Sequence, residues 1–485
     1  MNASTPYLDH HQMHQMPAEF QQCFDAQRAA YLAHPEPSYT ERLADLRNLY
    51  RMIQENREQL VAAINTDYGN RCAFETLFAE YFVVLETVND AIKHLKKWMK
   101  PQKRHADFMV YPGARNRVIP QPLGVVGVIV PWNFPLNLSF CPLVNIFAAG
   151  NRAMVKMSEN SRTLAELLIR ISPRYFPQDK LKFFEDGGGR GPAFSSLPFD
   201  HILFTGSGAT GRAVMANAAR NLTPVTLELG GKAPAIIGPD YPIQTAAERI
   251  LWVKMLNAGQ ICLNVDYVFL PEGQEQAFVA HCKRLFAQRY PDINGPDYTS
   301  IIDQRSFERL QNALEDARAK GATLINLCEG QQPDAALRKF APHIVLNLTP
   351  EMQLSQREIF GPILPVRSYR SKEEVAAYIN SKDRPLAIYP FTHDRTLQAY
   401  YITHVMSGGV SVNEALLHVG QHDLPFGGVG PSGMGHYHGR EGFNTFSKLR
   451  PVFYQGPFSA IQMMFQPPYA KRANKLLDLL IRFKT

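Results

Sequence analysis

The sequence has few of the features that stabilise a secreted scaffold or hold a protein in a membrane. Its 485 residues include only six cysteines, irregularly spaced and without a CxxC pair. This pattern excludes a disulfide framework and argues against a zinc site. No apolar run reaches the roughly 18 residues that a membrane-spanning helix needs, and residues 1–16 lack the basic and apolar regions of a secretory signal. We therefore expect a soluble cytoplasmic protein with no transmembrane segment and no bound metal.

The charge is also too weak and too dispersed for a protein that binds nucleic acid. Lys and Arg total 51 against 44 Asp and Glu, a net charge of +7, and no basic run interleaved with aromatic residues concentrates it. Such a surplus suits solubility and small anionic ligands. The 45% hydrophobic and 20% charged residues are typical of globular proteins. At about 150 residues per domain, the length favours about three domains or lobes.

Local periodicity indicates an α/β fold. Apolar residues recur at helical spacing over 29–100, whereas 101–121 contains Pro, Gly and isolated β-formers and is expected to be extended. From 123 onwards, short β-branched runs alternate with helical patterns. The run LGVVGVIVP at 123–131 is typical of a strand buried on both faces, and Ser161 is expected to cap the helix after it. This alternation predicts parallel sheets covered by helices on both faces.

The segment GSGATG at 206–211 fits the G-x-G-x-x-G pattern of a phosphate-binding turn between a strand and a helix. Backbone N–H groups at such a turn approach a pyrophosphate closely. Read alone, the pattern would make Glu228, 22 residues beyond Gly206, a ribose ligand. However, several strands precede this turn, and Glu228 lies in the Gly-rich segment ELGGK. The pattern by itself leaves dinucleotide binding open.

Two further segments contain groups suited to catalysis. Cys262 lies in NAGQICL, where small and polar neighbours favour an exposed thiol, although a single cysteine is more often a buried structural residue. Asn133 lies in PWNFP, a loop fixed by two prolines, where its amide has two N–H groups to donate. An Asn that only stabilises its own turn remains the alternative.

Together these segments resemble the aldehyde dehydrogenase superfamily over about 41–454. The motifs PWNFP, FTGS, ELGGK, GQxC, EIFGP and LPFGGVGPSGMGHYHG occur in the family's order, and Cys262 follows Glu228 by the family's 34 residues. The C-terminal motif most resembles class 3 enzymes, and within them the bacterial coniferyl aldehyde dehydrogenases. The match of six motifs at fitting spacing is far more specific than any one of them.

The resemblance implies an aldehyde dehydrogenase-like fold with a Rossmann-like NAD domain, an α/β catalytic domain and a small β bridging extension. Because such an extension adds to a partner subunit's sheet and edge strands are rarely left bare, a homodimer is expected. The C-terminal tail is amphipathic, and we expect it to dock on the dimer, with adhesion to a membrane surface as the alternative. The expected boundaries are 1–100 and 122–229 for the NAD domain (1–20 a mobile tail), 230–435 for the catalytic domain, 101–121 and 436–460 for the arms, and 461–485 for the tail.

The resemblance also implies the catalytic roles. Cys262 would attack the aldehyde carbonyl and form a thiohemiacetal. The Asn133 amide and the Cys262 backbone N–H would stabilise the oxyanion. Glu228 would be the general base that activates water to hydrolyse the thioester, rather than a ribose ligand.

Cofactor contacts follow from the resemblance in the same way. Lys156 and Glu159 resemble the pair that binds the adenosine ribose, although without the motif a solvated surface pair would be the ordinary interpretation. The Glu159 carboxylate disfavours a 2′-phosphate and so favours NAD, while Lys156 leaves NADP open. The residues expected to contact the cofactor are Trp132, Lys156, Glu159, Gly206, Ser207, Gly211, Leu229, Glu358 and Phe360.

The expected reaction is the NAD-dependent oxidation of coniferyl aldehyde to ferulate. A medium- or long-chain aliphatic aldehyde is the alternative substrate, and a catalytically silent binding protein on the same scaffold is a remote alternative. Met157, Ile261 and Val265 depart from the usual class 3 pattern, which has Pro, a hydroxyl residue and Pro at these positions. None of the three changes removes a reacting group, but they bear on substrate fit and thiol polarity. His436 and His438 are expected to be structural residues of the arm.

Overall fold

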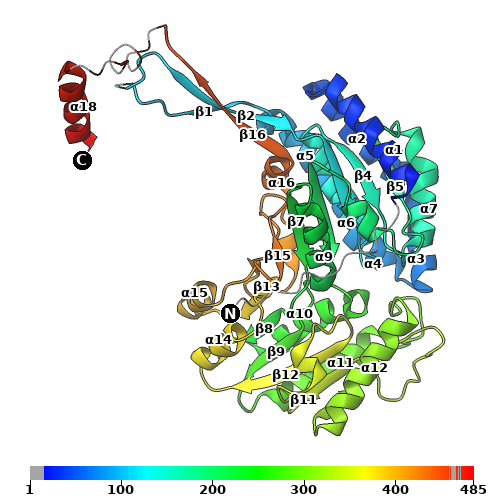
Figure 1. Cartoon of the computed structure of the whole chain (residues 1–485). Coiled ribbons are helices and arrows are strands. Elements are labelled where there is room, and N and C mark those ends of the chain that lie inside the picture. The colour runs from blue at the N-terminus through cyan, green and yellow to red at the C-terminus, as the bar shows by residue number, and fades with distance from the viewer. Residues whose placement is uncertain are drawn as a thin grey trace, which may run out of the picture.

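Two α/β lobes and a projecting β arm make up the structure, a computed structural model that describes residues 16–108, 110–457, 459, 462, 466–467, 469 and 471–484 (Figure 1). Each lobe is built on its own mostly parallel sheet, and the predicted α/β class is confirmed.

Helices form the N-terminal part, as the periodicity predicted. The first helix begins earlier than expected, because Phe20 is fully buried and its ring lies 4.9 Å from that of Phe184. The predicted mobile tail therefore does not extend to residue 20, and residues 1–15 lie outside the described part. The helices are α1 (Ala18–Ala33), α2 (Tyr39–Glu55), α3 (Arg57–Tyr68), α4 (Ala73–Thr76), the π-helix η1 (Leu77–Phe82) and α5 (Val83–Trp98).

The first sheet has six strands in the order β15-β7-β6-β3-β4-β5, parallel except for β15. Every residue of β3 is buried, as predicted for this run. Val125 and Ile129 belong to the hydrophobic cluster on one face, which includes Phe20, and Val126 and Val128 to the cluster on the other. The strands are β3 (Val125–Ile129), β4 (Arg152–Lys156), β5 (Leu181–Phe184), β6 (His201–Gly206), β7 (Val225–Leu229) and β15 (Gly433–Met434). The helices of this lobe after β3 are α6 (Asn137–Ala148), α7 (Arg162–Ile171), η2 (Ser172–Arg174), α8 (Gly191–Ser195) and α9 (Gly208–Ala219).

The expected cap of α7 is wrong in its chemistry. Ser161 does precede the helix, but its side chain makes no capping hydrogen bond. The Asp67 carboxylate, from α3, instead accepts hydrogen bonds from the N–H groups of Thr163 (2.8 Å) and Leu164 (3.0 Å). A carboxylate satisfies these orphan donors and also complements the helix dipole.

The second sheet has seven strands in the order β10-β11-β12-β9-β8-β13-β14, of which only the β10–β11 pair is antiparallel. Its strands are β8 (Pro234–Ile237), β9 (Tyr267–Pro271), β10 (Thr323–Asn326), β11 (His343–Leu346), β12 (Ile363–Tyr369), β13 (Ala387–Phe391) and β14 (Gly409–Val410). Its helices are α10 (Ile243–Met255), η3 (Leu256–Gly259), α11 (Glu275–Arg289), α12 (Gln304–Ala319), α13 (Gln353–Gln356), α14 (Lys372–Asn380), α15 (Arg395–His404) and η4 (Leu417–Gly420).

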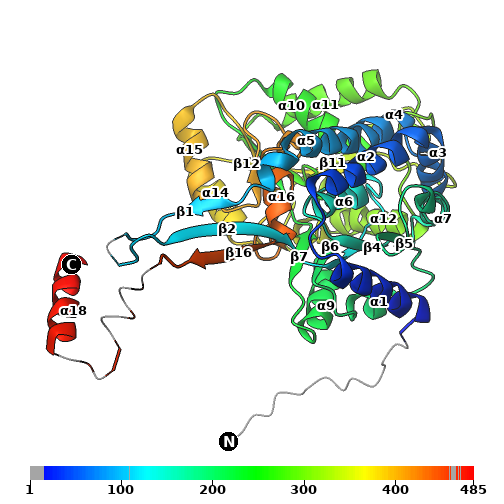
Figure 2. The same cartoon turned by 90° about the horizontal axis from the view of Figure 1, so that it is seen from above.

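The arm is an antiparallel sheet of β1 (Gln102–Arg104), β2 (Arg115–Pro122) and β16 (Ser447–Tyr454), in that order. It projects from the lobes, with helix α18 (Lys471–Lys484) beyond its far end (Figures 1 and 2). A short helix, α16 (Gly439–Thr445), leads into β16 and packs on α5 and α6. Within the described residues, no helix combines the length and apolar character needed to cross a bilayer.

Candidate active site

The predicted catalytic residues come from both lobes and lie close together. Cys262 follows η3 in the second lobe, Glu228 lies near the end of β7, and Asn133 lies in the loop after β3. Cys262 and Glu228 line one cavity of about 150 Å³. The Asn133 side-chain amide donates to the carbonyl of Gln260, 3.3 Å away and two residues before the cysteine. All three groups therefore lie in one region.

Glu228 is a buried carboxyl group without a partner. Neither side-chain oxygen has a hydrogen-bond partner among the described residues, and burial raises the pKa of Glu228 well above its ordinary value. A carboxyl group in such surroundings holds a proton more tightly than in water, which is the property required of a general base that works near neutral pH.

Cys262 is the one cysteine of the described chain that is not fully buried. Burial, followed by the negative charges of Glu358 and Glu228, raises the pKa of its thiol to about 12. Because only the thiolate is a strong nucleophile, this thiol must lose its proton to a neighbouring base before it attacks. Glu228, an ionisable group, lines the same cavity.

The backbone before the nucleophile is left-handed at three successive residues, with φ of 52° at Asn257, 48° at Ala258 and 76° at Gly259. For the two non-glycine residues this conformation costs about 1–3 kcal/mol each, and such strain is typical of functional sites. The Asn257 amide stabilises the turn by donating to the carbonyls of Gln260 (3.1 Å) and Asn133 (3.3 Å). The strained turn thus fixes the start of the cysteine loop against the Asn133 loop.

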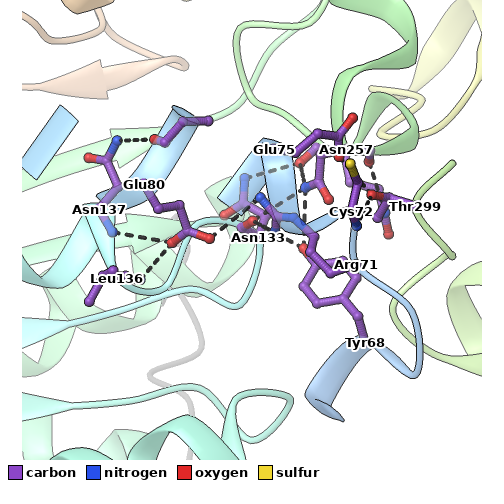
Figure 3. A network of polar contacts seen from close by, with 12 residues as sticks. Tyr68, Arg71, Cys72, Glu75, Glu80, Asn133, Leu136, Asn137, Asn257 and Thr299 are labelled. Atoms are coloured by element: carbon purple, nitrogen blue, oxygen red, sulfur yellow. Dashed lines mark hydrogen bonds and ion pairs between the residues drawn. The ribbon is translucent and has the colours of Figure 1, made fainter. Parts of the chain in front are cut away.

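A buried network around Arg71 holds the Asn133 loop (Figure 3). The Arg71 guanidinium donates to the main-chain carbonyl of Asn133 at 2.8 Å, and the Tyr68 hydroxyl donates to the same oxygen at 3.0 Å. Sequence reasoning missed both residues. They precede Asn133 by more than 60 positions, and nothing in their local sequence indicates the contact.

Glu80 completes this network from the π-helix η1. Its carboxylate lies 3.4 Å from the Arg71 guanidinium, both side chains being fully buried. It also accepts from the N–H groups of Leu136 (2.7 Å) and Asn137 (3.2 Å), where α6 begins. The same π-helix places Phe78 and Ala79 in the cavity wall. Burial outweighs these contacts and raises the pKa of Glu80 above its ordinary value.

The remaining cavity wall is mainly apolar and comes from both lobes. Ile261, one of the departures from the class 3 pattern, is part of it, so this change bears directly on substrate fit. His438 also lines the cavity and stacks on Phe426 at 5.2 Å, which corrects its expected place in the arm. The part of the chain that the structure describes contains no cluster of side chains suited to a metal. The further wall residues that sequence reasoning missed include Phe78, Val83, Phe134, Leu263, Leu386, Leu416, Phe426 and Tyr437.

One group of the predicted cofactor residues includes Glu358, whose negative charge acts on the Cys262 thiol. The rings of Trp132 and Phe360 are 5.4 Å apart, edge to face. A Glu358 oxygen is buried and has no hydrogen-bond partner in the part of the chain that the structure describes, and burial together with Asp266 raises the pKa of Glu358 to about 8. A Cβ atom at Gly230 would clash with the other Glu358 oxygen, so a larger residue there would displace this carboxyl group.

The second group lies along the carboxyl ends of β4, β6 and β7. Lys156 is buried, and its ammonium group donates a hydrogen bond to the Asp186 carboxylate at 2.6 Å. The alternative of a solvated Lys156–Glu159 pair on the surface is therefore wrong. Glu159 and Asp186 instead line a separate polar pocket. Ser207 caps α9 by accepting from the Thr210 N–H.

Gly211 allows close packing where α9 begins. A Cβ atom there would lie 2.7 Å from a methyl group of Leu229, at the end of β7. Gly206 ends β6, next to the Ser207 cap. The predicted G-x-G-x-x-G turn therefore does join a strand to a helix, with its last glycine used for helix–strand packing.

Comparison with known proteins agrees with this site and fold. The sequence profile described as "Aldehyde dehydrogenase family" matches residues 6–452. The chain therefore belongs to the aldehyde dehydrogenase family, whose members oxidise aldehydes with NAD(P).

Individual relatives match over nearly the whole chain. A probable coniferyl aldehyde dehydrogenase of Pseudomonas aeruginosa is 47% identical over 98% of this chain and 99% of its own. A coniferyl aldehyde dehydrogenase of a Pseudomonas species is 44% identical over 94% and 95%. Among solved structures, a substrate-bound Staphylococcus aureus AldH has a TM-score of 0.89 at 30% identity and covers 95% of this chain and 99% of its own.

Proposed function

We propose that this enzyme oxidises coniferyl aldehyde to ferulate with NAD. The observation that carries the proposal is the apolar cavity in which the partly exposed thiol of Cys262 and the unpartnered carboxyl group of Glu228 meet. The names of the two Pseudomonas relatives support the choice of substrate. Both reacting groups are present, which argues against a catalytically silent binding protein.

In the first half of the reaction, the Cys262 thiol transfers its proton to Glu228 and the sulfur adds to the aldehyde carbon. The resulting oxyanion accepts hydrogen bonds from the Asn133 amide and the Cys262 backbone N–H. The Asn133 amide has two N–H groups, and because only one of them is bonded to Gln260, the other is available to the oxyanion. Donors held in place before the reaction stabilise this charge without reorganisation.

The described residues fit NAD(P). The orphaned Glu358 oxygen near Cys262 would accept from a ribose hydroxyl, and Glu159 would do so in the polar pocket beside Lys156. When bound, NAD(P) supplies the acceptor for the hydride that leaves the carbon attached to Cys262. We propose NAD rather than NADP because the Glu159 carboxylate repels a 2′-phosphate. Trp132, Phe360, Gly206, Ser207, Gly211 and Leu229 complete the proposed contacts.

In the second half of the reaction, Glu228 first releases the thiol proton to solvent, and its carboxylate then takes a proton from the water that attacks the thioester. Its raised pKa makes the carboxylate a stronger base than an exposed glutamate. The Cys262 sulfur then leaves as the acid is released, and Glu228 passes the proton it took from water to this sulfur, which restores the thiol.

A substrate panel tests the proposal. With NAD, kcat/KM for coniferyl aldehyde should exceed that for decanal, and NADP in place of NAD should lower the rate. The mainly apolar cavity wall favours a medium- or long-chain aliphatic aldehyde as the second candidate. A clear preference for decanal would select that candidate and reject coniferyl aldehyde.

We further propose a homodimer in which the arm of each subunit extends the partner's sheet. The sheet order leaves β16 as an edge strand, and Phe453 and Tyr454 on it are exposed. Apart from the shorter N-terminal tail and the corrected place of His438, we keep the predicted domain division and cytoplasmic location as parts of this proposal, with the C-terminal tail docked on the dimer. Light scattering of the purified protein should give the mass of two chains. In cell fractionation, the protein should be found in the soluble fraction and not in the washed membranes.

A further inference from the structure

The ammonium group of Lys156 lies beside the polar pocket that we propose for the adenosine ribose. Lys156 ends β4, and its partner in the sheet register is Phe184, which ends β5. The pocket has a volume of about 370 Å³ and is lined by residues that follow these two strands. A free cation at this position would attract the 2′-phosphate of NADP. The partners of Lys156 therefore decide which cofactor the pocket favours.

Asp186 neutralises the charge of Lys156. Its carboxylate lies 2.6 Å from the ammonium nitrogen, and the side chains of Lys156 and Asp186 are only 5% and 10% exposed. Lys156 also donates to the carbonyl of Met157 at 3.1 Å. An ammonium group has three N–H donors, so one is left for a neutral ribose hydroxyl although the charge is paired. Burial acts in the opposite direction, but the Lys156 ammonium holds the pKa of Asp186 below its ordinary value, and the carboxylate stays ionised.

The loop after β5 fixes Asp186 in this position. The second carboxylate oxygen of Asp186 accepts from the N–H groups of Gly189 (3.1 Å) and Arg190 (2.9 Å). Both oxygens therefore have partners, one in the loop and one on β4. This arrangement makes the carboxylate a fixed part of the pocket wall.

The other charged residues of the pocket wall do not replace the cation. They are Glu159, Glu185 and Arg162. The Arg162 side chain is 76% exposed and lies 3.0 Å from the Glu166 carboxylate, so solvent and this partner weaken its attraction for a phosphate. With Lys156 paired, negative charge dominates the pocket and disfavours a 2′-phosphate.

We propose that Asp186 is a selectivity residue that excludes NADP by pairing with Lys156. The proposal rests on the proposed function and deepens it. Glu159 repels a 2′-phosphate directly, whereas Asp186 acts through Lys156, because it withholds the cation that would otherwise bind the phosphate. Loss of the Asp186 carboxylate should free the ammonium group and admit NADP.

Isothermal titration calorimetry with AMP and with adenosine 2′,5′-bisphosphate tests the proposal without aldehyde or turnover. The two ligands differ only in the 2′-phosphate, and the wild-type enzyme should bind AMP more tightly. Asp186→Asn should lower the ratio of the bisphosphate Kd to the AMP Kd about 10- to 100-fold, the usual worth of a hydrogen bond to a charged group. Asp186→Ser keeps a hydroxyl that can accept from the loop, and it should lower the ratio in the same way.

Three further variants separate the ion pair from the total charge of the pocket. Glu185→Gln removes a carboxylate from the same wall but leaves the Lys156–Asp186 pair, so it should lower the ratio much less. Adding Lys156→Met to Asp186→Asn should return the ratio towards the wild-type value. Asp179→Asn is the control outside the pocket, because Asp179 pairs with Arg152 at 3.5 Å, and it should leave the ratio unchanged.

The outcomes distinguish this proposal from the proposed function. An unchanged ratio in both Asp186 variants, including equal weakening of both ligands, would assign Asp186 a merely structural role and overturn the proposal. An equally large fall in Glu185→Gln would overturn it too, since total charge would then suffice. A wild-type enzyme with a higher kcat/KM for NADP than for NAD would instead overturn the choice of NAD in the proposed function.

Discussion

Glu228 should reduce the stability of the folded enzyme, although we propose that its carboxyl group serves the reaction. Both oxygens are buried without a partner among the described residues, and burial raises the pKa of Glu228. An unsatisfied buried polar group costs about 1–3 kcal/mol. Replacement by Leu removes that cost, and we therefore expect Glu228→Leu to unfold with a free energy about 1–3 kcal/mol above that of the wild type, while it loses aldehyde oxidation.

The stability difference should depend on pH in a defined direction. The folded state binds the Glu228 proton more tightly than the unfolded state, so wild-type stability falls as the pH rises from the ordinary value of 4.5 towards the raised folded pKa. The advantage of Glu228→Leu should therefore be smallest near pH 4 and should grow as the pH rises through this window.

Unfolding midpoints in guanidinium chloride at pH 5 and pH 8 measure this effect. Glu58→Leu is the control, because Glu58 is an exposed helical residue and such surface changes usually stay within about 0.5 kcal/mol. A Glu228→Leu variant less stable than the wild type at pH 8, or an advantage that shrinks as the pH rises, would show that the Glu228 carboxylate is stabilised by contacts and would refute this reasoning.

Three further predictions concern the groups around Glu228. Alkylation of Cys262 by iodoacetamide, followed by mass spectrometry, should rise about tenfold per pH unit between pH 7 and pH 10, because the thiol pKa of about 12 lies above this range; a plateau below pH 9 would contradict it. Arg71→Met should lower the free energy of unfolding by about 3–5 kcal/mol by leaving Glu80 unpaired, and adding Glu80→Leu should restore most of it; an additive loss in the double variant would refute the pairing argument. Asn133→Ala should lower kcat about 10²- to 10³-fold with little change in folding, and an unchanged kcat in steady-state assays would remove Asn133 from the oxyanion site.

Local sequence patterns were sufficient to predict helices and strands but not the long-range contacts between them. The run from Val125 to Ile129 is β-branched and apolar throughout, so its burial on both faces could be predicted. Ser161 precedes α7 as expected, but the carboxylate that caps the helix comes from Asp67, nearly a hundred residues earlier. A cap supplied by another helix leaves no local pattern.

The site shows the same division. Motif order indicated Cys262, Glu228 and Asn133, whereas Arg71 and Glu80 were missed because their function depends on tertiary pairing. Glu80 reaches the start of α6 from a π-helix. The periodicity of apolar residues does not reveal the extra residue per turn of such a helix. His438 was misplaced because it lies at the end of the last motif, close to the strand of the arm, whereas the chain there still forms part of the cavity wall.

The central claim is that the Cys262 sulfur forms the covalent bond to the substrate carbon and Glu228 directs water to break it. Peptide mass spectrometry of Glu228→Gln after incubation with coniferyl aldehyde and NAD tests this most directly. We expect an acyl group attached to the peptide that contains Cys262, and no such adduct in a Cys262→Ala, Glu228→Gln double variant. An acyl group on a different residue, or full aldehyde oxidation by Cys262→Ala alone, would contradict it.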